Sequence, residues 1–225
     1  MGQRTAACHT IMAGLATPAF VPEPETKSSQ RALYQSMRNL TNRAAQALEL
    51  TTPPTGQEAS PHRRLPVGLL QQYFARLLTM EPMGQRIRLH GDFALDNPLH
   101  LGKDFMLVDF DGDVRAPVGE RSIKRSALRD VATMIASIGL TAEQALRRHL
   151  ERNPADRESL SPWLSLWRRT SLLTYLTAYL EEAGGAAFLP ADIAATRHLL
   201  LVFVLEHSLQ ALLRALVERP EDIPI

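Results

Sequence analysis

The stretch that decides the fold runs from Arg86 to Asp113 and reads RIRLHGDFALDNPLHLGKDFMLVDFDGD. We expect a short apolar strand over 87–89, a loop ending at Asn97-Pro98, and a second strand over 105–108 reached through a tight turn at 102–104. Oxygen-bearing side chains gather towards the ends of this hairpin: Asp92, Asp96, Asn97, Asp109, Asp111 and Asp113. Clustered carboxylates repel one another unless a cation lies between them, and Mg²⁺ prefers oxygen ligands. The spacing alone therefore predicts either a magnesium site or a hairpin with solvated acidic ends.

The composition is that of an ordinary soluble globular domain, with 225 residues, 45% hydrophobic and 22% charged. The net charge of +1 gives no reason to expect binding to nucleic acid or to an anionic membrane. The single cysteine, Cys8, excludes an internal disulfide and fits a reducing compartment. No signal pattern opens the chain, and the apolar run from Leu199 to Leu205 is far shorter than a membrane span. We therefore expect a cytoplasmic protein.

Apolar residues at helical spacing predict helices on both sides of the hairpin. The expected helices cover 2–13, Ser28 or Ser29 to about 50, Pro66 to Pro82, Ser126 to Ile138, a short helix from Thr141, Ser159 or Ser161 to Gly184, and Pro190 to about 218. Residues 51–66, rich in proline, read as a loop. The fold class is therefore mainly α with a small β-hairpin (α+β). We expect a single domain over 1–225, made of N-terminal helices with the proline-rich loop (1–85), the hairpin (86–113) and a helical part (114–225).

The hairpin also carries a recognisable motif. HGD-x4-N followed by an apolar strand ending in Asp109-Phe110-Asp111 resembles the catalytic core of the aminoglycoside-phosphotransferase-like kinases. The longer blocks LHLGKDFMLVDFDGD, VGERSIKRSALRDVA and YLEEAGGAAFLPAD are similar to the maltokinases, including the kinase part of trehalose synthase–maltokinase fusions. PAFVPEPET and ALYQSMRNLTNR near the start and VERPEDIPI at the end extend the resemblance over nearly the whole chain. It implies a protein-kinase-like C-terminal lobe without the N-terminal nucleotide-binding lobe, because no Gly-rich loop and no strand lysine precede the hairpin.

The resemblance also implies an activity and its residues. A maltokinase moves the γ-phosphate of ATP onto maltose to give maltose 1-phosphate. Asp92 would accept the proton of the acceptor hydroxyl, and Asn97 and Asp109 would hold Mg²⁺. Asp111 stands where the family usually has glutamate and would hold a second ion. The alternative for Asp92 and Asn97 is a turn residue that bonds its own backbone.

His90 and Asp130 would support the catalytic loop, the first by packing beneath it and the second by bracing it from a helix. Simple pairing with a nearby arginine is the alternative for Asp130. Two positions depart from the family's usual HGD-x-H-L-G pattern, because Ala94 replaces a histidine and Asp96 replaces a glycine. Asp96 adds negative charge near the predicted base, which can raise its pKa or attract a cation. Both departures put full activity in doubt.

Two further groups of side chains are open to interpretation. The basic residues after the hairpin include Arg121, Lys124 and Arg125. They either steer a nucleotide or phosphorylated product or form a solvated loop, and we favour the loop. Aromatic residues recur along one predicted helix at Trp163, Trp167, Tyr175 and Tyr179. Such a line can stack on a sugar ring, but core packing is the reading we favour.

The leading hypothesis is thus a maltokinase C-terminal lobe that binds maltose or a similar small sugar, uses ATP and Mg²⁺, and needs the missing lobe for full activity. The alternative is a truncated, non-catalytic relative that acts as a binding or assembly module with trehalose synthase. A third reading, a kinase of an aminoglycoside or of choline, shares the same loop.

Overall fold

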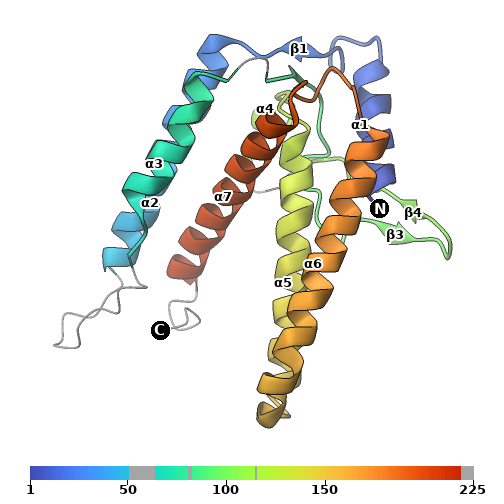
Figure 1. The fold of residues 1–225 in the computed structure, drawn as a ribbon. Helices are drawn as coiled ribbons and strands as arrows, with labels where there is room; N and C mark the ends of the chain where they lie inside the picture. The colour runs from blue at the N-terminus through green and yellow to red at the C-terminus, as the bar shows by residue number, and fades with distance from the viewer. Residues whose placement is uncertain (51–63, 81–82, 115, 219–225) are drawn as a thin grey trace.

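The computed structural model describes residues 1–50, 64–80, 83–114 and 116–218, and it is mainly helical with two small antiparallel sheets (Figure 1). The helices are α1 (Gly2–Gly14), α2 (Lys27–Leu50), α3 (Val67–Ala75), α4 (Val118–Arg121), α5 (Leu128–Leu150), α6 (Arg157–Glu182) and α7 (Ile193–Glu218), with 3₁₀ turns η2 (Arg76–Leu78) and η3 (Pro154–Asp156). Strand β1 (Glu23–Pro24) pairs with β2 (Gln85–Arg86), and β3 (Leu99–His100) pairs with β4 (Phe105–Met106). The predicted fold class is confirmed.

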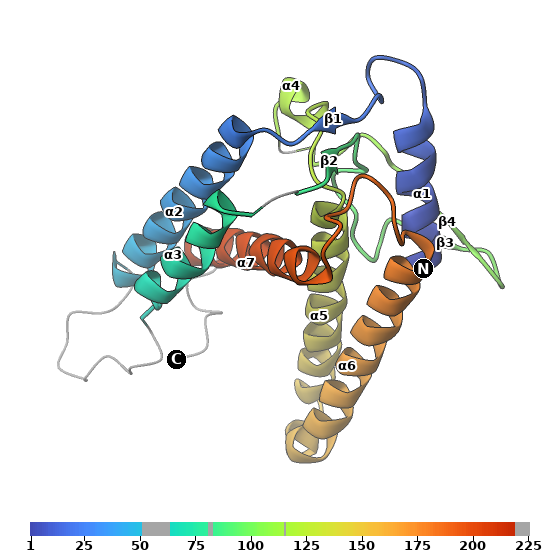
Figure 2. The same ribbon diagram turned by 45° about the horizontal axis from the view of Figure 1, so that its top comes forward.

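Helix α7 is the centre of the arrangement. It lies between the α2–α3 pair and the α5–α6 pair, and it packs against α2 and α5 (Figures 1 and 2). Its residues Leu199, Val202 and Phe203 join the core that α2, α3 and α5 also line. Helix α7 thus has neighbours on two sides, and its sequence is rich in apolar residues. By length and composition it is a candidate membrane span over Ile193–Leu216, with a third of its most apolar window buried.

Helix α1 packs along α6, and the β3–β4 hairpin projects from the body beside it (Figure 1). The close approach of α1 to α6 depends on Gly2, because a Cβ there would lie 2.3 Å from the carbonyl oxygen of Tyr175. A two-pronged ion pair between Arg4 and Asp104 joins α1 to the hairpin turn. Gly102, at φ +79°, makes that turn.

The hairpin is shorter than predicted, and its first strand is a different segment. We expected 87–89 as a strand, but these residues form only an isolated bridge, in which Ile87 and Arg125 exchange two backbone hydrogen bonds of 2.9 Å. The strand that pairs across the Gly102 turn is the next apolar segment, β3. Strand β2 instead pairs with the proline-containing β1.

The predicted break at Gly139 is wrong. Helix α5 continues through it from Leu128 to Leu150, so the separate helix from Thr141 does not exist. Ile138 and Ala142 are both buried, and burial of this continuous face outweighs the cost of about 1 kcal/mol for a glycine inside a helix.

Helix starts moved by a few residues because the capping groups differ from those predicted. Thr26 caps α2, since its hydroxyl accepts from the N–H of Ser29 at 3.1 Å while the Ser29 hydroxyl accepts from the N–H of Thr26 at 2.9 Å. Asp192 caps α7, accepting from the N–H groups of Ala194 and Ala195. The predicted loop over 51–66 lies outside the described residues for 51–63.

Candidate functional site

His90 fixes the loop that contains Asp92. Its imidazole is buried, its Nε2 donates to the carbonyl of Val108 at 2.8 Å, and its ring packs against Phe93 and Phe110 at centroid distances of 5.1 and 4.8 Å. Because a carbonyl only accepts, the proton is on Nε2. The loop is therefore tied to the segment that follows β4.

Asp130, in the first turn of α5, holds the same loop from the other side. Its buried carboxylate accepts from the backbone N–H groups of His90 at 2.9 Å and Gly91 at 3.1 Å. The Nε2 of His9 on α1 is a third partner at 3.2 Å, and the Nδ1 of His9 lies 3.1 Å from the hydroxyl of Tyr179 on α6. Three helices thus converge, through one carboxylate, on the backbone of one loop.

Two glycines bring this loop against the segment after β4. Gly91 and Gly112 have φ values of +88° and +74°, in the left-handed region that favours glycine. A Cβ on Gly91 would lie 3.1 Å from the Cα of Gly112, so Gly91 has no room for a larger residue without a shift of its neighbour. Asp92 and Asp113 follow these glycines and are brought to the same region.

A polar cavity of about 370 Å³ opens at this contact. Its wall combines acidic, basic and neutral polar groups: Asp92, Asp113 and Asp130 from the loops and α5, Arg121, Arg125 and Arg129 from the segment around the start of α5, and Glu206, His207, Gln210 and Arg214 from α7. Asp92 itself is half-buried. A carboxylate on such a wall is placed to meet a hydroxyl-bearing ligand that enters the cavity.

The structure does not place the predicted metal ligands on this wall. Asp109 and Asp111 are exposed, and Asn97 is half-buried with its Oδ1 accepting from the N–H of Ala94 at 2.9 Å. This Asn97 bond is the turn geometry that we kept as an alternative. Among the described residues, no group of three or more His, Cys, Asp or Glu side chains is arranged to hold a metal ion. Asp109 does stand out, because its φ of +67° is the only left-handed value at a described non-glycine residue.

The donor set fits Mg²⁺ only in part. Mg²⁺ usually takes one or two protein carboxylates and completes its shell with water and substrate phosphates. The exposed carboxylates of Asp109 and Asp111 offer the right oxygen chemistry for that mode, but a preformed protein cage is not present among the described residues.

The three basic residues after the hairpin have separate surroundings. Arg121 donates to the backbone carbonyls of Ala116 at 2.8 Å and Val114 at 2.7 Å, so it holds its own loop together. Lys124 donates to the carbonyl of Pro18 and pairs with a glutamate of β1. Arg125 is half-buried and lines the cavity. We favoured a solvated loop for these residues, but each of the three is either hydrogen-bonded to the protein or half-buried.

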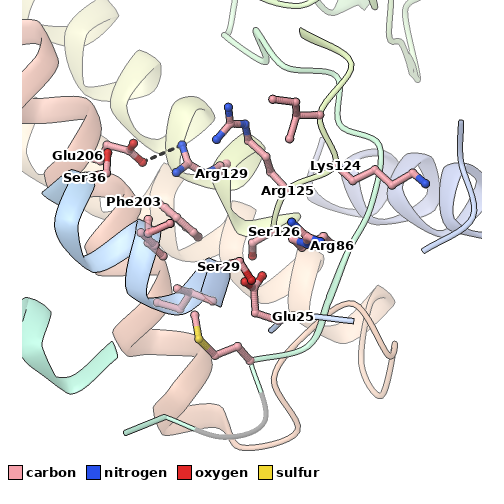
Figure 3. Close-up of a pocket in the computed structure, with 15 residues that line it drawn as sticks. Glu25, Ser29, Ser36, Arg86, Lys124, Arg125, Ser126, Arg129, Phe203 and Glu206 are labelled. Carbon is pink, nitrogen blue, oxygen red and sulfur yellow. Dashed lines mark ion pairs between the residues drawn. The ribbon is translucent and has the colours of Figure 1, made fainter. Parts of the chain in front are cut away.

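Glu206 is the site residue that sequence reasoning missed. It is buried on α7, and it pairs with Arg129 at 2.8 Å, while the Arg129 guanidinium lies 4.6 Å from the ring centre of Phe203 (Figure 3). A sequence signal for it existed. Glu206 falls three residues after Phe203 and three before Leu209, so it occupies a core-facing position of an otherwise apolar helix.

The aromatic line of α6 divides into two parts. Tyr175 and Tyr179 are buried, as we favoured, but Trp163 and Trp167 are 69% and 48% exposed. Neither tryptophan lines the cavity that contains Asp92.

Comparison with known proteins supports the fold. No family model matches the chain. Solved structures of glucosamine kinase do match, with TM-scores of 0.73 for crystal form A and 0.74 for the complex with glucosamine, ADP and inorganic phosphate. Each is 21% identical in sequence, and each alignment covers 97% of this chain but only 48% and 49% of the glucosamine kinase. The chain therefore has a kinase-like fold, and it spans about half the length of the solved structures that it matches.

Proposed function

We propose that this chain is the acceptor-binding part of an ATP-dependent sugar kinase. The observation that carries the proposal is the Asp92 loop, held by His90 and Asp130 and opening onto a polar cavity. A glucosamine kinase with the same fold binds glucosamine and ADP, which supports a sugar acceptor and a nucleotide donor. We propose that residues 86–113 contain the catalytic residues and that residues 114–225 supply most of the wall of the acceptor-binding cavity.

In this proposal Asp92 orients the acceptor hydroxyl and takes its proton, a contribution typically worth about 10²–10⁴-fold in rate. His90 and Asp130 do not touch the reacting atoms and act as positioning residues. Asn97, Asp109 and Asp111 remain the proposed holders of Mg²⁺ together with the phosphates of ATP, which the exposed position of the two aspartates suits. The metal would neutralise phosphate charge.

The acceptor that we propose is maltose, with maltose 1-phosphate as the product, on the strength of the sequence resemblance. Glucosamine is the first competitor to test, because it is bound by a protein of the same fold. The cavity volume of about 370 Å³ is at the lower end for ligand sites and suits one or two sugar rings.

A nucleotide-binding lobe would be the partner of this chain, either joined to it or as a second polypeptide. Three large apolar side chains on the projecting hairpin support this, because Leu99, Leu101 and Met106 are each about half exposed. Association with trehalose synthase is the partner that the sequence resemblance adds. We propose a cytoplasmic location on the same ground.

A non-catalytic role is the second candidate, and specific observations favour it. The Asn97 amide oxygen already accepts a hydrogen bond from the loop, and the exposed Asp96 adds a charge beside the proposed base. A binding module of this kind would retain sugar binding and lack binding of Mg²⁺–ATP.

Titration calorimetry of the 225-residue chain with maltose, glucosamine and Mg²⁺–ATP separates the two candidates. The kinase proposal expects sugar binding, weak nucleotide binding lost in Asp109→Ala, and phosphotransfer only when a nucleotide-binding lobe is supplied. In that assay Asp92→Asn should lose about 10²-fold or more in rate, whereas Asp156→Asn in η3, with a side chain 47% exposed, should not. Sugar binding with no Asp109-dependent nucleotide binding would establish the non-catalytic module instead.

A further inference from the structure

Arg125 differs from Arg129 and Arg86 in having no ion-paired carboxylate, although the charges of Glu206 and Glu120 act on it. Arg129 pairs with Glu206, and Arg86 pairs with Glu23 at 3.0 Å. Within the described part of the chain, no hydrogen bond and no ion pair involves the Arg125 guanidinium. A half-buried guanidinium that no anion contacts directly is costly, and the anionic group of a ligand would lower that cost.

The backbone fixes where this guanidinium lies. Arg125 exchanges two backbone hydrogen bonds with Ile87, the residue that leads into the Asp92 loop. Figure 3 shows the Arg125 and Arg129 side chains next to each other, with Arg129 joined to Glu206. Burial, and then the charge of Arg129, lower the pKa of Arg125, while the charges of Glu206 and Glu120 act in the opposite direction. An anion between the two arginines would relieve both effects.

Arg125 also lies where two cavities meet. The second cavity, of about 330 Å³, shares Arg125, Arg129 and Glu206 with the cavity that contains Asp92. Its wall also includes Ser36, which lines both cavities, and Ser126, which follows Arg125 in the chain (Figure 3). Charged and hydroxyl groups of this kind bind sugar hydroxyls, and a guanidinium pair binds phosphate.

We propose that Arg125 and Arg129 hold the phosphate group of a phosphorylated sugar, with the sugar hydroxyls bound by Ser36 and Ser126. This deepens the proposed function, because a sugar phosphate is the product of the proposed reaction. The chain would thus hold its product beside Asp92, and a sugar phosphate would compete with the unphosphorylated acceptor.

Binding of phosphate compounds to the full chain tests the proposal without any phosphotransfer. Inorganic phosphate, glucose 1-phosphate, ADP and glucose are titrated by calorimetry against wild type, Arg125→Gln and Arg125→Lys, with Arg169→Gln on the exposed face of α6 as the matched control. Circular dichroism melting confirms that each variant is folded. The Lys variant keeps the charge, so it tests the site even if loss of charge disturbs folding.

We expect inorganic phosphate and glucose 1-phosphate to bind wild type and the control equally. Arg125→Gln should weaken both about 10- to 100-fold, with Arg125→Lys in between and glucose unaffected. Equal binding to wild type and Arg125→Gln, or no binding of either phosphate to wild type, would overturn the proposal. Arg125-dependent binding of ADP but not of glucose 1-phosphate would also overturn it, by assigning the subsite to the nucleotide. The phosphotransfer assay tests the kinase proposal separately, so the two proposals can fail independently of each other.

Discussion

Replacing Asp130 tests whether one buried carboxylate holds the Asp92 loop. All three of its partners are donors: the N–H groups of His90 and Gly91, and the Nε2 of His9. Asp130→Ala leaves these donors without the carboxylate that they share, which is expected to cost about 3–5 kcal/mol. This is a large part of the 5–15 kcal/mol typical of a whole domain, so Ala is expected to be severely destabilised.

Asp130→Asn is the more informative variant, because it keeps the shape of the side chain. The amide has one acceptor oxygen in place of two, so one of its N–H groups must face a donor of the loop or of His9. We expect a loss of about 1–3 kcal/mol in the free energy of unfolding. Where the opening is local, hydrogen exchange of the His90 and Gly91 amides should be about 10- to 100-fold faster.

Urea denaturation and amide hydrogen exchange measure the two quantities. Asp156→Asn is the matched control, since this aspartate is 47% exposed and pairs with an exposed histidine, and its loss should cost less than about 0.5 kcal/mol. If Asp130→Asn unfolds like wild type, or if it loses stability while the two loop amides exchange as before, the carboxylate does not brace the loop.

Three smaller predictions follow from local geometry. Gly84→Ala should lower the free energy of unfolding, measured with urea, by about 2 kcal/mol or more, because its φ is +80° and a Cβ would lie 2.7 Å from a backbone carbonyl oxygen. Gly139→Ala is the control, because a Cβ there meets nothing within 4 Å, and it should leave the free energy of unfolding unchanged or raise it by up to about 1 kcal/mol. The opposite order would contradict the geometry. Burial raises the pKa of Cys8 to about 11, so alkylation of the thiol should be slow at pH 8 and its rate should rise about tenfold per pH unit towards 11. The stability that comes from keeping the thiol neutral is present below the unfolded pKa of about 8.5 and should fall as the pH rises towards 11. Equal alkylation rates in folded and urea-unfolded protein at pH 8 would disprove this. Tyr179→Ala should lower the free energy of unfolding by about 3–5 kcal/mol, because the ring is fully buried. Trp163→Ala should change it by less than about 0.5 kcal/mol, because this side chain is 69% exposed. Equal losses would show that α6 buries a different face.

The sequence predicted the helices well where an apolar stripe ran between clear end signals. The Met37, Leu40 and Ala44 stripe of α2 is buried, and the helix ends at Leu50 as predicted. The same reasoning failed at Gly139. A glycine and a capping pattern are local signals, whereas the burial of Ile138 and Ala142 on either side of the predicted break depends on tertiary packing. Whether a strand finds a partner is also a tertiary property.

The candidate site was predictable in its motif but not in its wall. The family resemblance carried by the HGD motif and by the block containing LRDVA indicated Asp92 and Asp130. Arg125 was singled out only as part of a basic run, and the spacing of Glu206 indicated only a core-facing position. Their roles could not be predicted, because they depend on α7 packing beside α5 and on which cations already have partners. The spacing of residues along the chain shows neither the packing of these helices nor their ion pairs.

The two sides of the proposed chemistry differ in how far this chain prepares them. On the acceptor side, Asp130 and His90 fix the loop by hydrogen bonds to its backbone, so Asp92 meets a ligand with little loop reorganisation left to occur. On the nucleotide side, Asp109 and Asp111 are exposed, and the described residues form no preassembled metal site. This chain alone should therefore contain nearly all of the groups that bind the acceptor. Nucleotide binding should depend on phosphate and metal ligands supplied from outside it, which is the asymmetry expected of half a kinase.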